Sequence, residues 1–267
     1  MKGILKIFIL LLFACFTLAI PIILLYVGMK PSGIDLKSVA ATQGFSLNNF
    51  IDLFSGDLDY AKSFRQGLFL SIIYSLFVGI GVMILTFASN LWVSSLSQKK
   101  AIGLTFFLLS LTLLPQTFLI LMGLKLTSIM SINNNEIVRI VIYLLISILP
   151  ISIWFFYFFN NRKIRQLLTS FSLDGLNSKR IFYLLLSELR KEFFIVLTFI
   201  TLLVWGNFLI PFSLGTSNSF PALVYISSFT SNLGRDWALI SAGSFLLLVP
   251  VFVLTIIILK YGQIRSN

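Results

Sequence analysis

Residues 68–93 read LFLSIIYSLFVGIGVMILTFASNLWV, an apolar stretch that holds small polar residues but not one charged side chain. A helix needs about 20 mostly apolar residues to cross the hydrocarbon core of a bilayer. A surface helix of a soluble protein instead carries a polar face, because one of its sides meets water. The stretch therefore predicts a transmembrane helix and places the chain among integral membrane proteins.

Five further stretches have a similar length and composition. We expect six transmembrane helices in all, joined by loops, at about residues 7–29, 68–93, 101–124, 140–159, 193–212 and 238–259. The first stretch follows Lys2 and Lys6 and in this resembles a signal peptide. Because its apolar run continues well beyond Cys15, we expect an uncleaved helix. The sequence thus predicts an all-α membrane protein with a single transmembrane domain over residues 1–267.

The composition of the chain excludes most kinds of enzyme site. Hydrophobic residues make up 58% of its 267 residues and charged residues only 11%, against roughly 25% charged residues in soluble proteins. Histidine is absent, which removes the usual general base and a common zinc ligand. Nine acidic residues and one cysteine leave little for carboxylate or thiol chemistry. We therefore expect no catalytic residue and no metal site in this chain.

The distribution of basic residues predicts the orientation in the membrane. With the N-terminus in the cytoplasm, 13 of the 20 Lys and Arg residues fall in cytoplasmic segments, and six of the nine acidic residues fall outside. Positive charge collects on the cytoplasmic side of membrane proteins. We therefore expect both termini in the cytoplasm, with the chain in a cell membrane. The same bias accounts for most of the net charge of +11 without a nucleic-acid partner.

The most charged loop, residues 160–192, has the pattern of two helices separated by a glycine. Apolar residues recur at helical spacing before Gly175 and again after it, and basic residues lie between them. The apolar positions are Ile164, Leu167, Leu168 and Phe171 in the first half and Ile181, Phe182, Leu185 and Leu189 in the second. Gly175 suits the left-handed conformation that ends many helices. Taken alone, the pattern also fits an amphipathic helix that rests on lipid headgroups.

This loop carries part of a family signature. Asp174-Gly175 is followed, seven residues on, by the hydrophobic-Phe pair Ile181-Phe182. These residues resemble the cytoplasmic signature of type I ABC importer permeases, closest to the carbohydrate-uptake branch of the maltose permeases and to its second permease subunit. The Glu-Ala-Ala half of the signature is replaced by Thr169-Ser170-Phe171, and the downstream Leu-Pro by Ser187-Glu188.

Three other stretches agree with this family in order and spacing. They are Leu113-Leu114-Pro115 in the third span, Trp205-Gly206-Asn207-Phe208-Leu209-Ile210-Pro211 in the fifth, and Asp236-Trp237 with Ala242-Gly243 and Pro250 in the sixth. Each stretch is a weak signal alone. Together they extend the similarity from about residue 48 to residue 262, which makes the whole more specific than any part.

The resemblance implies a transport function that depends on other proteins. A second, different permease subunit would complete the pathway as a heterodimer in membrane lipid, and two cytoplasmic ATPase subunits would bind ATP and Mg²⁺. An extracellular solute-binding protein would deliver a sugar or oligosaccharide, and no cofactor is implied in this chain. In the family, the signature loop docks on an ATPase subunit as a coupling helix. This role would fall to Leu168, Thr169, Ser170, Phe171, Asp174, Gly175, Leu176, Ile181 and Phe182.

Polar residues inside the spans are candidates for the substrate pathway. We single out Gln116 beside Pro115, and Asn207 close to Trp205. An amide can hydrogen-bond to a sugar hydroxyl, and an aromatic face can stack on a sugar ring. The alternative is that these amides only hydrogen-bond between helices, as many buried Asn and Gln residues do in membranes.

The sequence leaves other functions open. The same architecture could import a polyamine, an amino acid or a phosphate ester. A channel would work without an ATPase, and a membrane enzyme would need clustered His, Asp or Glu near the membrane surface, which the spans lack. No charged residue lies at mid-membrane, and this argues against a proton- or ion-coupled transporter.

Overall fold

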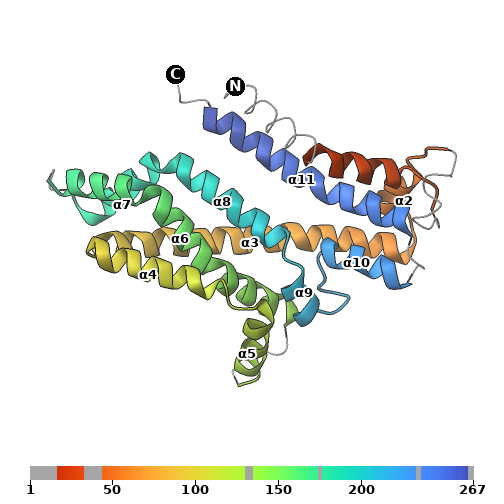
Figure 1. Cartoon of the computed structure of the whole chain (residues 1–267), viewed down its shortest axis with the longest axis horizontal. Helices are drawn as coiled ribbons and strands as arrows, with labels where there is room; N and C mark the ends of the chain where they lie inside the picture. The colour runs from red at the N-terminus through yellow and green to blue at the C-terminus, as the bar shows by residue number, and fades with distance from the viewer. Residues whose placement is uncertain (1–16, 33–43, 130–134, 174–175, 233–235, 264–267) are drawn as a thin grey trace, which may run out of the picture. The chain divides into compact units, whose positions relative to one another are not determined.

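The computed structural model describes residues 17–32, 44–129, 135–173, 176–232 and 236–263. Every regular element within these ranges is a helix, which confirms the all-α prediction (Figure 1). After a helix over Thr17–Gly28, the elements are α2 (Asn48–Ser55), α3 (Asp59–Ser95), α4 (Gln98–Leu111), α5 (Gln116–Ile129), α6 (Glu136–Leu173), α7 (Ser178–Glu188), α8 (Arg190–Trp205), α9 (Leu209–Leu214), α10 (Ala222–Asn232) and α11 (Trp237–Gln263). The chain divides into two compact units, residues 1–69 with 220–253 and residues 70–219 with 254–267.

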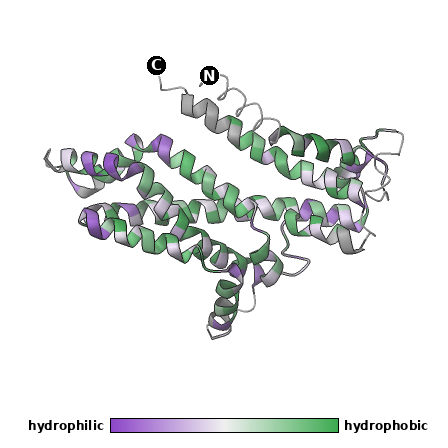
Figure 2. Ribbon diagram, in the orientation of Figure 1, coloured by the Kyte–Doolittle hydropathy of each residue, from purple (hydrophilic) through white to green (hydrophobic). Residues whose placement is uncertain are grey.

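Three of the described helices are each long and apolar enough to cross a membrane. The qualifying stretches are Asp59–Ser95, Glu136–Phe171 and Trp237–Leu254, in α3, α6 and α11. These helices contain the predicted spans at 68–93, 140–159 and 238–259, which are therefore confirmed as apolar helices. Figure 2 shows hydrophobic residues along these helices. Large apolar side chains remain exposed on them, as Phe77 at 70% exposure illustrates. Lipid tails tolerate such a surface because they are as apolar as the side chains.

The third predicted span, 101–124, is formed by two helices and not by one continuous helix. α4 ends at Leu111, α5 begins at Gln116, and the two helices are bent by 87°. Pro115 explains the break, because in a continuous helix its ring would collide with the carbonyl of Leu111 and it has no N–H to donate. Figure 1 shows α5 turning away from α4. Pro115 thus lies at a helix boundary and not inside a helix.

The fifth predicted span, 193–212, is also interrupted. α8 ends at Trp205, and the short α9 begins at Leu209. A helix continued through this point would press the ring of Pro211 against the carbonyl of Asn207. Instead, the side-chain Oδ1 of Asn207 accepts a hydrogen bond from the Ile210 N–H at 3.2 Å.

For the first predicted span, 7–29, the structure shows a helix over Thr17–Gly28. Residues 7–16 lie outside the described residues.

Two helices lie in segments that the sequence predicts to be loops. α2 falls between the first two predicted spans, and α10 falls between the last two. α10 is well packed, since Ala222 is 0% and Phe229 2% exposed. The sequence does not predict α10, because its short apolar stretch lies among many Ser and Asn residues. This stretch is Ala222-Leu223-Val224-Tyr225-Ile226.

The first unit is held together by close glycine packing and by side-chain caps. A Cβ atom added to Gly28 would lie 3.0 Å from backbone atoms of Ala242 in α11, so this glycine permits a close approach of two helices. Asn49 of α2 donates hydrogen bonds to the carbonyl oxygens of Gly28 and Lys30, at 2.8 and 2.7 Å. These bonds satisfy carbonyls that the end of the first helix leaves without a partner in the helix.

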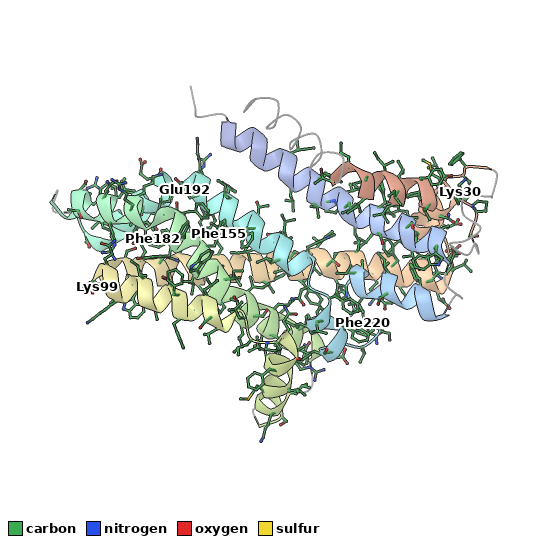
Figure 3. The ribbon with its side chains drawn as sticks, in the orientation of Figure 1. Lys30, Lys99, Phe155, Phe182, Glu192 and Phe220 are labelled. Carbon is green, nitrogen blue, oxygen red and sulfur yellow. The ribbon has the colours of Figure 1, made fainter. Side chains whose placement is uncertain are left out.

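The second unit has one main apolar core, to which α3, α5, α6, α7, α8 and α9 contribute. Val78 of α3, Phe156 of α6 and Ile200 of α8 are fully buried in it. Phe155 of α6, labelled in Figure 3, stacks on Phe199 of α8, with ring centroids 4.5 Å apart. This core fixes the positions of the residues that the sequence singles out for function.

The segment predicted as a separate loop, residues 160–192, begins inside α6. This helix continues without a break to Leu173, so the fourth predicted span and the first predicted helix of the segment form one helix. Phe156, Asn160 and Ile164 recur four residues apart and are 0%, 3% and 0% exposed, which keeps one face of α6 on the core through this region. The predicted second helix of the segment is present as α7.

Candidate coupling segment and pathway pocket

Hydrophilic residues gather at the end of the second unit where α4 begins and α7 lies (Figure 2). Lys99, Phe182 and Glu192 mark this end in Figure 3. Arg165 of α6 donates from its Nη2 atom to the carbonyl of Leu96, just after α3, at 2.8 Å. The turn between α3 and α4 and the segment 160–192 therefore share one end of the unit, which the predicted orientation requires of two cytoplasmic loops.

Polar contacts tie this end of the unit together. Arg165 also donates from Nε to Asn161 Oδ1 at 3.0 Å. Lys163 pairs with Glu192 at 2.6 Å and donates to the Glu188 carbonyl at 3.0 Å, which joins α6 to the beginning of α8. The side chains of Lys163 and Glu192 are 42% and 25% exposed. Water screens such a pair, so its contribution to stability is modest, at about 0–1 kcal/mol.

The predicted coupling residues divide into a half-buried set and an exposed set. Leu168, Phe171 and Ile181 are half-buried and pack against the core of the second unit. Thr169 and Ser170 are exposed, and their hydroxyls donate to carbonyls one turn earlier in α6, at 2.9 and 3.1 Å. The half-buried residues therefore hold the segment on the unit, while the exposed residues remain accessible to another protein.

Leu176, another predicted coupling residue, makes a backbone hydrogen bond to the last turn of α6. The N–H of Leu176 donates to the carbonyl of Phe171 at 3.3 Å. A bond across five residues is typical of the motif in which a glycine ends a helix. Asp174 and Gly175 lie outside the described residues.

A chain of three aromatic rings joins α7 to the core. Phe182 of α7 meets Phe87 of α3 edge to face with ring centroids 5.6 Å apart, and Phe87 meets Phe156 of α6 in the same way at 6.1 Å. Phe87 is 4% exposed, whereas Phe182 keeps 43% of its surface exposed. If α7 moved, the ring contacts would therefore transmit the movement to α3 and α6. The sequence pattern does not single out Phe87, because it stands in a long run of apolar residues.

Two of the four predicted pathway residues line a single pocket. Gln116, at the start of α5, and Asn207, between α8 and α9, border a cavity of about 430 Å³. The other lining residues are Thr112, Ser147, Ile148, Ile151, Leu203, Gly206, Phe208 and Leu209. Pro115 and Trp205 are not among the lining residues, although each is a neighbour in sequence of one that is. Both helix interruptions of the second unit therefore open onto this pocket.

A carboxylate at the start of α6 holds the loop that follows α9. Oε2 of Glu136 accepts hydrogen bonds from the N–H and Oγ1 of Thr216, at 3.2 and 2.7 Å, and from Ser219 Oγ at 2.8 Å. The guanidinium of Arg139 donates to the carbonyl of Leu214. The loop is thus fixed to α6. The sequence does not predict this contact, because the residues lie far apart along the chain.

Comparison with known proteins agrees with the motifs. No protein-family profile matches the chain. Among curated proteins, it is similar to the arabinooligosaccharides transport system permease protein AraQ of Bacillus subtilis (strain 168), with 26% identity over 256 residues. The match covers 90% of this chain and 86% of AraQ, so it is a similarity of whole chains and not of one motif. This similarity supports the resemblance, drawn from the sequence, to the permeases of carbohydrate ABC importers.

Proposed function

We propose that the chain is one of two permease subunits of an ATP-driven importer and forms half of the pathway for a neutral sugar or oligosaccharide. The observation that carries this proposal is the similarity, along 90% of the chain, to a protein named as an arabinooligosaccharides transport system permease. Arabinooligosaccharides are therefore the first cargo to test. In this role the chain is a non-catalytic transmembrane subunit, and ATP is hydrolysed by separate ATPase subunits.

The proposed architecture has six spans and both termini in the cytoplasm. Among the described residues, α3, α6, α11 and the bent pair α4–α5 supply up to four spans. The apolar helix Thr17–Gly28 and the interrupted pair α8–α9 would supply the other two. The excess of Lys and Arg in the proposed cytoplasmic segments supports this orientation.

We further propose that the segment 160–192 docks on an ATPase subunit. The exposed Thr169 and Ser170 and the partly exposed Phe182 are accessible for this contact, and Asp174-Gly175-Leu176 would complete the surface. Because Thr169 replaces the glutamate of the family signature, docking would rely on shape and apolar contact in place of an ion pair. The ring contact between Phe182 and Phe87 supports this role, since it connects the docking surface to the core.

The pocket favours a neutral cargo over the charged alternatives. None of the ten residues that line it is ionisable. A polyamine or a phosphate ester would lose its hydration there without gaining an opposite charge, which is a large cost in a partly apolar cavity. A sugar would find apolar side chains beside uncharged hydrogen-bonding groups, the usual composition of a small-molecule site.

Cross-linking from the proposed docking surface tests this function. Thr169→Cys is made in a Cys15→Ser background, so that the new thiol is the only one in the chain. We expect a short thiol-to-amine cross-linker, added to inverted native membranes, to join this position to a protein that carries an ATP-binding sequence. The cross-linked complex, purified through a tag on this chain, should also contain a second, different permease subunit.

A matched control is Ser55→Cys in the same background. Ser55 is exposed, as Thr169 is, but lies in α2, in a segment that the proposed orientation places outside the cell. It should give no ATPase product. Equal yields from the two positions, or no ATPase product from Thr169→Cys, would reject the proposed docking surface.

A further inference from the structure

The two hydroxyl groups that line the pocket each donate their hydrogen to a carbonyl of the same chain. Ser147 Oγ donates to the carbonyl of Leu144 at 3.0 Å, and Thr112 Oγ1 donates to the carbonyl of Leu109 at 2.6 Å. A hydroxyl has one hydrogen and two lone pairs. While each hydrogen is used within the chain, Ser147 and Thr112 present lone pairs to the pocket, and these accept hydrogen bonds.

Asn207, in contrast, can donate hydrogen bonds to a molecule in the pocket. Its Oδ1 atom accepts from the Ile210 N–H, which identifies the other terminal atom as the amide nitrogen. The two N–H groups of that nitrogen are then left to donate. Gln116, which is exposed at the mouth of the bend between α4 and α5, brings a second amide with both a donor and an acceptor.

The remaining walls of the pocket are mainly apolar. Ile148 and Ile151 come from α6, Leu203 from α8, and Phe208 and Leu209 from the region where α9 begins. The ring of Phe208 stacks on Phe212 with centroids 5.1 Å apart, which holds it in place. A volume of about 430 Å³ lies in the range of small-molecule sites, about 300–1,000 Å³.

We propose that Ser147 and Thr112 are specificity residues that read hydroxyl groups of the cargo by accepting hydrogen bonds from them. This inference rests on the proposed function and deepens it. The pocket takes a neutral, hydroxyl-rich molecule that donates to Ser147 and Thr112 and accepts from Asn207. A cargo hydroxyl that is removed, or capped as a methyl ether, leaves one of these acceptors without a partner. The sequence pattern does not indicate either residue, because Ser and Thr are common in spans as contacts between helices.

The test compares sugars that differ in one hydroxyl, in the complete transporter reconstituted into liposomes with saturating solute-binding protein. Uptake is measured for arabinotriose and for its monodeoxy analogues. The variants are Ser147→Ala and Thr112→Val, with Ser110→Ala as the matched control. Ser110 Oγ also donates to a carbonyl three residues earlier, that of Phe107 at 2.7 Å, but Ser110 does not line the pocket.

We expect Ser147→Ala and Thr112→Val each to slow the uptake of arabinotriose by about threefold to tenfold, the effect of one hydrogen bond. For at least one deoxy analogue the same substitution should have no further effect, because the hydroxyl that would have donated is already missing. Any selectivity of the solute-binding protein cancels in this comparison, since it is the same for all permease variants. Ser110→Ala should behave as the wild type with every sugar.

Two results would overturn the inference, and they differ in meaning. If Ser147→Ala and Thr112→Val slow all sugars by one common factor, or slow none, these residues do not read hydroxyls and the proposed function stands. The same result is expected if the second permease subunit fills the pocket. If the wild-type complex imports neither arabinotriose nor other neutral trisaccharides such as xylotriose and maltotriose, the proposed function fails and the inference fails with it.

Discussion

Replacing Phe87 by alanine is expected to lower the free energy of unfolding by about 3–5 kcal/mol. The Phe87 side chain is 4% exposed and touches both Phe156 and Phe182. Alanine would leave a cavity in the core of the second unit and remove two edge-to-face ring contacts, each worth about 0.5–1.5 kcal/mol beyond the area that they bury. Unfolding of the purified chain in mixed micelles by increasing amounts of SDS measures the change.

The control for this prediction is Phe77→Ala on the same helix. Phe77 is 70% exposed, so its replacement should change the free energy of unfolding by no more than about 0.5 kcal/mol. A similar loss for Phe77→Ala and Phe87→Ala would show that the ring contacts of Phe87 are not what stabilises this part of the unit. The aromatic path from α7 into the core would then lose its support.

Replacing Arg165 by alanine is expected to lower the amount of sugar imported per ATP hydrolysed by about tenfold or more. Arg165 joins α6 to the turn after α3 through the Leu96 carbonyl and also holds Asn161. A hydrogen bond from a charged group contributes about 1.5–3 kcal/mol, which is roughly a tenfold or larger effect on the population of the joined state. The measurement is the ratio of uptake to ATP hydrolysis in proteoliposomes.

Arg162→Ala is the matched control, because it removes the same charge from the same helix. Arg162 is exposed, one turn before Arg165. It should leave the ratio of uptake to hydrolysis close to that of the wild type. Arg165→Lys should restore little, since a lysine keeps the charge but not the planar fork that reaches two acceptors. An unchanged ratio in Arg165→Ala would remove this contact from the coupling route.

The long apolar helices could be predicted from the sequence because a physical length requirement fixes them. Residues 68–93 and 140–159 have no charged side chain and match the thickness of a bilayer, and α3 and α6 include them. The ends of these helices could not be predicted in the same way. α6 continues past residue 159 because Asn160 and Ile164 stay on the core, and hydropathy does not register that packing.

A comparison of prolines inside helices with the proline at a helix boundary shows why the helix breaks could not be predicted from the sequence. Pro150 lies inside the continuous α6, whereas Pro115 separates α4 from α5. Near Pro150, Ile148 and Ile153 are each 5% exposed, while near Pro115, Leu113 is 80% and Leu114 38% exposed. Pro250 also lies inside a continuous helix, α11, although Val249 and Phe252 near it are 44% and 46% exposed. A proline in the sequence therefore does not by itself show whether a helix breaks there.

The candidate pocket could be predicted only in part. Gln116 and Asn207 stand out because an amide in an apolar span is unusual, and the structure brings both to one cavity. Their meeting depends on two helix breaks far apart in the sequence, at residues 112–115 and 206–208. Ser147 is an ordinary hydroxyl residue within a span, and only its position on α6 facing the cavity distinguishes it.

Uptake of labelled arabinotriose by proteoliposomes, with and without this chain, tests the central claim most directly. The liposomes contain the second permease subunit and the ATPase subunits, and solute-binding protein is added on the opposite side from ATP. We expect uptake that needs both ATP hydrolysis and this chain, and that stops when a non-hydrolysable ATP analogue replaces ATP. Uptake that continues without ATP, or that is unchanged when this chain is left out, would contradict the account.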